Sequence, residues 1–207
     1  MTSAQIERLD RLRETVRSSM SEYRFDHTAE VEKMAARLGE LFAPEKLYIL
    51  RAAALLHDIT KELSTEEQIK LCGTYGIELT PLDIAAPRTL HPITAAAVIP
   101  ERYPEFAEEE IISAVRWHTT GRAQMSLCDK LIYLADYIDM SRKFKDCVEI
   151  RNYFFDACPE SMMESERAEH LRQTLILSFN RTIEILIEEG SAISPDTFEA
   201  RNSLIIG

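Results

Sequence analysis

The chain has 207 residues, enough for one sizeable helical domain with a buried core. Hydrophobic residues make up 45% of it and charged residues 29%, a mixture that gives no sign of disorder. The formal net charge is −11, so the surface repels phosphate backbones and we expect no nucleic-acid partner.

Apolar residues recur at helical spacing through most of the sequence. A first amphipathic helix is predicted over residues 6–20. Residues 21–26 are predicted to form a turn that delivers His27 to the start of a second helix, which runs through Leu41. Pro44 suits the first turn of a third helix, whose apolar end, RAAALLHD, is expected to be buried.

The middle of the chain is predicted to be less regular. Ser64 and Glu67 form a capping-box pattern for a helix that Gly76 can close. Residues 76–90 include two prolines and predict a loop with room for one helical turn. Helical patterns then resume in the strings HPITAAAVIPERY, AEEEIISAVRWH and SLCDKLIYLADYID, with a break at Gly121.

The last third is predicted to hold a helix over 146–157, a long helix over 160–189 and a short final helix. Gly190 ends the long helix, and Ser194 with Pro195 is typical of the cap and first position of the last one. No repeat or linker is evident. We therefore expect a single all-α domain over residues 1–207, a bundle of about eight to ten helices. No apolar run is long enough to span a bilayer and no leader opens the chain, so a cytoplasmic protein with no membrane partner is expected.

The polar residues of the apolar helices predict a metal site. His57 and Asp58 end the apolar segment of the third helix, and Asp136 follows the apolar run LIYLA. A carboxylate leaves water only when it is paired or metal-bound. Imidazole and carboxylate ligands suit iron, manganese, zinc or cobalt, and no CxxC pair indicates a structural zinc site. Six candidate ligands suit two ions that share Asp58: His27, His57, Asp58, His91, His118 and Asp136.

These residues carry a family resemblance. His27, the pair His57-Asp58, and Asp136 resemble the pattern that defines the HD-domain superfamily of metal-dependent phosphohydrolases, and His91 and His118 resemble its two-metal branch. The strings HDITKEL, WHTTGR, DKLIYLADYID and ARNSL are similar to those of the YqeK-type symmetrical diadenosine tetraphosphate hydrolases of bacteria. The likeness covers nearly the whole chain. It implies a hydrolase that cleaves this small nucleotide into two ADP through a metal-bridging hydroxide, with iron as the first candidate metal.

The resemblance also implies roles for single residues. One ion is expected on His27, His57, Asp58 and Asp136, and the other on Asp58, His91 and His118. Lys61, one helical turn beyond Asp58, and Arg122, close to His118, are expected to meet substrate phosphates and to act in catalysis with Asp58. The remaining predicted substrate contacts are Thr119, Thr120, Arg142, Arg201 and Asn202.

Other interpretations stay open at this point. The same ligand set supports mixed-valent di-iron oxygenases on this fold, although such a pocket does not need the cations Lys61 and Arg122. A (p)ppGpp or dNTP phosphohydrolase belongs to the same enzyme class, and a non-catalytic nucleotide-binding module would be a third class. His170, among charged residues, is expected to be solvated and without a role, and the four cysteines to be buried free thiols. A symmetric homodimer would be ordinary for a helical protein of this size.

Overall fold

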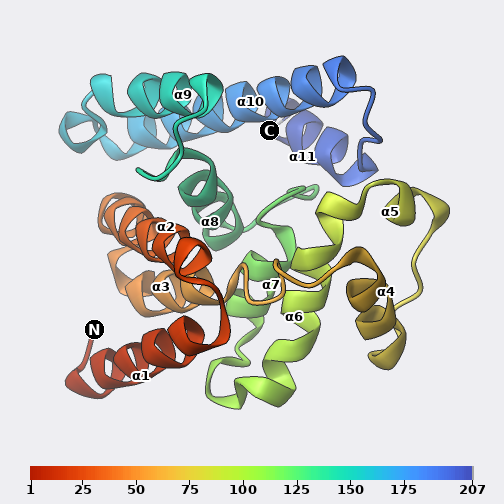
Figure 1. The fold of residues 1–207 in the computed structure, drawn as a ribbon. Helices are drawn as coiled ribbons and strands as arrows, with labels where there is room; N and C mark the ends of the chain where they lie inside the picture. The colour runs from red at the N-terminus through yellow and green to blue at the C-terminus, as the bar shows by residue number, and fades with distance from the viewer. Residues whose placement is uncertain (207) are drawn as a thin grey trace.

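The computed structural model describes residues 1–206, which form eleven α-helices and no β-strand (Figure 1). The predicted all-α fold class and helical bundle are confirmed. None of the described helices has both the length and the apolar character needed to cross a membrane. In chain order the helices are α1 (Ser3–Ser19), α2 (Glu22–Phe42), α3 (Leu47–Leu56), α4 (Thr65–Thr74), α5 (Pro81–Ala85), α6 (Leu90–Arg102), α7 (Glu109–Trp117), α8 (Leu127–Ile138), α9 (Lys145–Asp156), α10 (Glu164–Glu188) and α11 (Pro195–Ile206).

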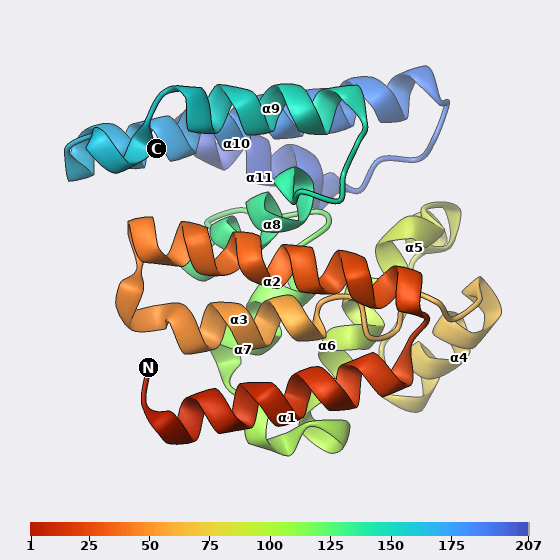
Figure 2. The same ribbon diagram turned by 60° about the vertical axis from the view of Figure 1, so that its left-hand side comes forward.

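The N-terminal helices pack as a stack around α3, with α1 on one side of it and α2 on the other (Figure 2). A capping box between Thr2 and Gln5 begins α1, which buries Leu9, Leu12 and Val16. Helix α3 is buried along nearly its whole length, which explains its apolar sequence. Its C-terminal end therefore delivers His57 and Asp58 to the interior of the protein.

Helix α8 lies between this stack and a C-terminal layer made of α9, α10 and α11 (Figures 1 and 2). It contacts α2, α3 and α7 on one side and α9 and α10 on the other. Helix α6 packs against α7 and α4. The ends of α3 and α7, the start of α6 and the middle of α8 thereby come together, and this junction positions the candidate site.

One predicted boundary beside a candidate ligand is wrong. Ser21 caps α2 by accepting a hydrogen bond from the backbone N–H of Arg24, so residues 22–26 are helical and not a turn. His91 lies in the first turn of α6, where the helical pattern was predicted to resume, and it is buried. Proline fits there because the first turn of a helix has no intrahelical partner for its N–H groups.

Two other residues differ from their predicted environments. His170 is half-buried: its Nε2 lies 3.0 Å from the carbonyl oxygen of Phe154, and its ring stacks on that side chain at 5.3 Å between centroids. Its role is therefore packing between α9 and α10. Cys158 is exposed, whereas the other three cysteines are buried free thiols as predicted.

Gly121 is required by both conformation and packing. Its φ is +63°, and a Cβ atom there would lie 2.6 Å from Cζ of Phe179 and 2.8 Å from Cβ of Ala200. We expect Gly121→Ala to lower the free energy of unfolding by about 3 kcal/mol or more, combining left-handed strain with overpacking. Urea unfolding would measure this.

The matched control is Gly76→Ala, where φ is +66° and no atom lies within 4 Å of the added Cβ. This variant should lose only the backbone contribution, about 1–2 kcal/mol. Equal losses in the two variants would contradict the close packing of Gly121 against α10 and α11.

Candidate metal centre

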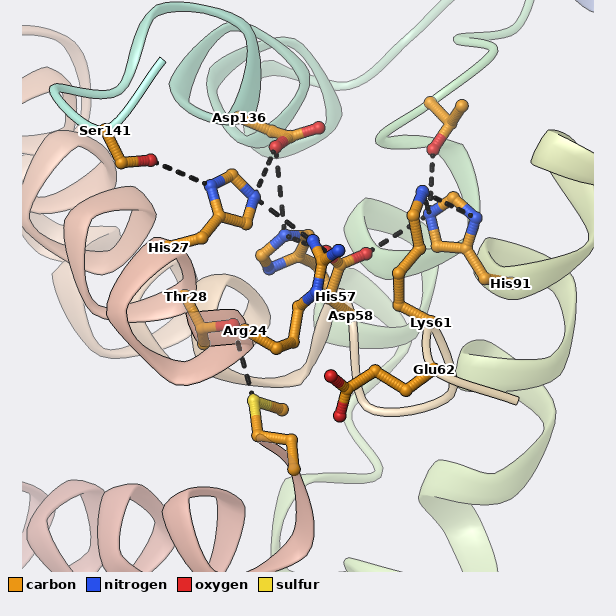
Figure 3. Close-up of polar contacts among 12 residues, drawn as sticks. Arg24, His27, Thr28, His57, Asp58, Lys61, Glu62, His91, Asp136 and Ser141 are labelled. Atoms are coloured by element: carbon orange, nitrogen blue, oxygen red, sulfur yellow. Dashed lines mark hydrogen bonds and ion pairs between the residues drawn. The ribbon is translucent and has the colours of Figure 1, made fainter. Parts of the chain in front are cut away.

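The other five candidate ligands gather around Asp58 at the junction of five helices. Its Oδ1 lies 3.3 Å from Nε2 of His91 and 3.8 Å from Nε2 of His118. Its Oδ2 lies 3.4 Å from Nε2 of His57 and 3.8 Å from Nε2 of His27. A single carboxylate thus faces four imidazole nitrogens, one oxygen toward each pair (Figure 3 shows three of the four rings).

Asp136, on α8, closes the site on the side of His27. Its Oδ1 lies 3.0 Å from Nε2 of His27 and 3.9 Å from Nε2 of His57. Two triads have ligand atoms within 4.8 Å of one another, namely His27, His57 and Asp136, and His57, Asp58 and His118. His91 lies beside the second triad, with its Nε2 3.0 Å from Nε2 of His118.

Backbone carbonyls fix the orientation of three of the histidines. The Nδ1 atoms of His57, His91 and His118 lie 2.6, 2.9 and 2.7 Å from carbonyl oxygens three residues earlier in the chain. A carbonyl can only accept, so each Nδ1 carries the hydrogen. In a neutral imidazole this leaves Nε2 as a free acceptor, the arrangement commonly found around histidines that bind metals.

The donor set fits metal ions. Nε2 of His57 and Oδ1 of Asp58 are buried and have no hydrogen-bond partner among the described residues. Unpaired buried polar atoms cost about 1–3 kcal/mol each. The Nε2 atoms of His91 and His118, 3.0 Å apart, both present lone pairs when Nδ1 carries the hydrogen. Cations bound among these atoms would satisfy all four.

The protonation of the buried groups is compatible with this role. Burial lowers the pKa of His118 to about 4 and that of His91 well below its usual value, so both rings are neutral. Burial alone would raise the pKa of Asp58, but the neighbouring His57 and Lys61 hold it well below its usual value. Neutral imidazoles and an ionised carboxylate are the forms that bind metals.

His27 and Asp136 behave as a coupled pair. Burial disfavours the charged form of His27, but the hydrogen bonds that its ring donates to Asp136 and Asp139 raise its pKa to about 9. Burial would likewise raise the pKa of Asp136, and Arg142 and His27 hold it well below its usual value. His27 must therefore release a proton when it binds a metal.

Three cations face the ligands. Nζ of Lys61 lies 3.2 Å from both ring nitrogens of His91, and burial lowers its pKa. Arg142 Nη2 lies 2.6 Å from Oδ1 of Asp136. Arg24 Nη1 lies 2.8 Å from Oδ2 of Asp58 (Figure 3). The side chains that could meet substrate phosphates thus already lie beside the carboxylates.

Arg24 and Asp139 were not among the residues predicted from the sequence. Arg24 precedes His27 by three residues, which places both on one face of a helix, but this signal needs the helix start at Glu22. Asp139 follows Asp136 by three residues, and its Oδ2 lies 3.5 Å from Nδ1 of His27. Asp139 thus lies at the ring nitrogen of His27 that points away from Asp58 and Asp136.

Some of the predicted substrate contacts lie beside the candidate ligands, and others bind residues elsewhere in the protein. Thr119 lies in the site, with Oγ1 3.2 Å from Nε2 of His91, whereas the buried hydroxyl of Thr120 donates to the carbonyl oxygen of Gly121. Arg122 instead pairs with the buried Asp129 at 3.0 Å.

The last two predicted contacts also lie in other clusters. Arg201 donates to Asn180 at 2.8 Å and to Asn202 at 3.0 Å. Within residues 1–206, none of the polar contacts of Arg122, Arg201 or Asn202 involves a candidate ligand.

A pocket of about 520 Å³ opens beside His118 and Asp136. It lies between residues 85–89, α8, α9, α10 and the start of α11. Its lining combines aromatic rings with charged groups of both signs, namely Tyr133, Tyr137, Phe144, Arg88, Arg142, Asp136, Asp146 and Glu189. A pocket of this size with aromatic walls suits a small aromatic molecule that reaches the ligands at one end.

Known proteins share this arrangement. The HD domain family matches residues 24–141, which include all six candidate ligands. A Bacillus subtilis protein named "Bis(5'-nucleosyl)-tetraphosphatase, symmetrical" is 31% identical over 93% of this chain and 95% of its own length. A protein of the same name from Halalkalibacterium halodurans is 29% identical over 92% of this chain and 94% of its own.

A solved structure is similar as well. The crystal structure of a "predicted HD superfamily hydrolase involved in NAD metabolism" from Clostridium acetobutylicum has a TM-score of 0.82 and 32% identity, and covers 95% of this chain and 96% of that one. The family match, the relatives along the whole length and the shared fold agree. The chain belongs to the HD domain family, in the group of the bacterial symmetrical bis(5'-nucleosyl)-tetraphosphatases.

Proposed function

We propose that this protein is a two-metal hydrolase that cleaves diadenosine tetraphosphate symmetrically into two ADP. The observation that carries the proposal is the convergence of four imidazole nitrogens on the two oxygens of Asp58. Full-length relatives named as symmetrical tetraphosphatases support the substrate. The aromatic rings of the adjacent pocket support a ligand that carries a base.

Two ions would be shared among the six ligands. His27, His57 and Asp136 would hold one, His91 and His118 the other, and Asp58 would bridge them. Bound ions of this kind lower the pKa of water and neutralise phosphoryl oxygens. Imidazole and carboxylate ligands suit iron, which we propose as the native metal, with manganese, cobalt and zinc as alternatives.

The chain's own residues bind and orient the substrate. Arg142 lines the pocket and reaches Asp136, so it can bridge from the ligands to a phosphate in the pocket. Lys61 and Thr119 place an ammonium and a hydroxyl beside His91, where they can hold phosphoryl oxygens of the other half. One nucleoside diphosphate half would thus lie in the pocket, and the other beyond Asp58.

Phe144 offers a test of how the pocket binds a nucleoside. It is 68% exposed yet lines the pocket, which suits a ring that stacks on a base. Phe144→Ala is expected to raise KM for diadenosine tetraphosphate about tenfold with little change in kcat, since base stacking is worth about 1–3 kcal/mol. The control is Tyr153→Ala, an exposed aromatic residue of α9 outside the pocket lining. A lowered kcat with unchanged KM would contradict stacking.

The proposal extends to location and assembly. The described cysteines form no disulfide, which suits a reducing compartment, and we propose the cytoplasm. A symmetric homodimer is a further prediction, because closed two-fold dimers are the commonest assemblies of soluble proteins. Light scattering would measure the assembly.

Product analysis tests the proposed reaction. Protein loaded with iron or manganese would be incubated with diadenosine tetraphosphate, and the nucleotides separated by chromatography. ADP as the only product is expected, because symmetrical cleavage breaks the central anhydride. AMP with ATP, or oxygen uptake without nucleotide turnover, would reject the proposal, and oxygen uptake would favour the di-iron oxygenase alternative.

A further inference from the structure

The guanidinium of Arg24 is only partly hydrogen-bonded. It lies one helical turn before His27 on α2, and its side chain is only 20% exposed. Nη1 donates to Oδ2 of Asp58 at 2.8 Å. Nε is buried and has no hydrogen-bond partner among the described residues. Because a guanidinium carries five N–H donors in a planar fork, Arg24 has further N–H groups that can donate to another acceptor beside Asp58.

Arg24 also competes with a metal for one atom. Oδ2 of Asp58, its partner, lies 3.4 Å from Nε2 of His57 and 3.8 Å from Nε2 of His27. An ion held by these two histidines would bind that oxygen. The guanidinium and the ion carry charge of the same sign, so they repel each other over this short distance.

Arg142 makes a similar contact but is held more firmly. Its Nη2 lies 2.6 Å from Oδ1 of Asp136, while its Nε donates to the backbone carbonyl of Asp136 at 2.9 Å and lies 3.4 Å from Oδ2 of Asp139. Losing one carboxylate oxygen would leave Arg142 with these other partners. Among the described residues, the side chain of Arg24 donates a hydrogen bond only to Asp58, so a bound ion would release Arg24 first.

We infer that Arg24 changes partner when the site is loaded. Without metal it neutralises Asp58. With metal bound, its fork turns to a phosphoryl oxygen of the substrate or of the diphosphate product, a geometry that suits arginine. The nature of this phosphate ligand rests on the proposed function. Arg24 is thus a substrate-binding residue whose availability depends on the metal.

Binding measurements on Arg24→Gln test this, because the two affinities should change in opposite directions. The metal-free variant should bind Mn²⁺ about tenfold more tightly than wild type, since a competing cation is gone. The Mn²⁺-loaded variant should bind ADP about tenfold to a hundredfold more weakly, as expected for the loss of a charge-assisted hydrogen bond. Isothermal titration calorimetry measures both constants without turnover.

Two further variants complete the design. Arg24→Lys keeps the positive charge, so its Mn²⁺ affinity should stay close to wild type while ADP binds more weakly. Arg13→Gln removes a guanidinium of α1 that pairs with Glu32 of α2 at 2.6 Å, away from the candidate ligands. This variant should change neither the Mn²⁺ affinity nor the ADP affinity. If Arg24→Gln weakens both ligands, or leaves ADP binding unchanged, Arg24 does not change partner.

The same experiment separates this inference from the proposed function. If wild type releases no ADP from diadenosine tetraphosphate but Arg24→Gln still shows the two opposite shifts, the proposed substrate is wrong and the inference stands. If wild type cleaves the substrate and both affinities of the variant fall together, the inference alone is wrong.

Discussion

Replacing Asp58 with alanine is expected to lower kcat/KM for diadenosine tetraphosphate by about a thousandfold or more, the scale seen when a group that stabilises transition-state charge is lost. The physical reason is its position. Its two oxygens face four imidazole nitrogens, so no neighbouring carboxylate can replace it. Its removal also leaves Arg24 without its carboxylate partner.

Elemental analysis and steady-state kinetics on the same preparations would measure this loss. Asp58→Ala should contain less than one ion per chain when wild type contains two. The control is Asp26→Ala, which removes an exposed carboxylate next to His27 on α2 and should retain metal and activity. A variant of Asp58 that keeps both ions and wild-type turnover would show that Asp58 is not the shared ligand.

Removing the metals is expected to abolish hydrolysis and to lower Tm by about 5–10 °C. A ligand present at a hundred times its Kd stabilises the folded state by about 2.7 kcal/mol, and 1 kcal/mol shifts Tm by about 2–4 °C in a protein of this size. Some buried ligand atoms, such as Nε2 of His57, lack hydrogen-bond partners among the described residues, and a bound ion would stabilise the fold by binding them. Calorimetry before and after treatment with a chelator would measure it.

Two comparisons make the chelation result specific. Adding Mn²⁺ back to the treated protein should restore both Tm and turnover. The melting temperature of Asp58→Ala should hardly respond to the chelator, because that variant lacks the shared ligand. An equal fall in Tm for wild type and Asp58→Ala would mean that the chelator acts elsewhere on the protein.

Local sequence signals predicted most of the helices. The capping box of Ser64 and Glu67 begins α4 as expected, and Gly76 ends that region with φ of +66°. Ser194 and Pro195 mark the start of α11. Such signals act within one or two turns of a helix, so neighbouring residues alone can specify them. The start of α2 was missed because the string SEYRFD lacks a clear apolar period.

The clustering of the candidate ligands was predictable for a different reason. A charged residue in a helix that is otherwise apolar demands a partner, and Asp58 and Asp136 both have this environment. The environments of other residues depend on distant parts of the chain. Arg122 follows His118 closely in sequence, yet the buried Asp129 binds its guanidinium. The nucleotide-sized pocket is made by helices far apart in sequence, and no local pattern describes it.

The most direct test of the site is a crystal structure of the metal-loaded protein with anomalous scattering data. Two anomalous peaks are expected, about 3.5–4 Å apart. One should lie among His27, His57, Asp58 and Asp136, and the other among Asp58, His91 and His118. A single peak, or a peak whose ligands do not include Asp58, would contradict the two-metal site on which the proposed function depends.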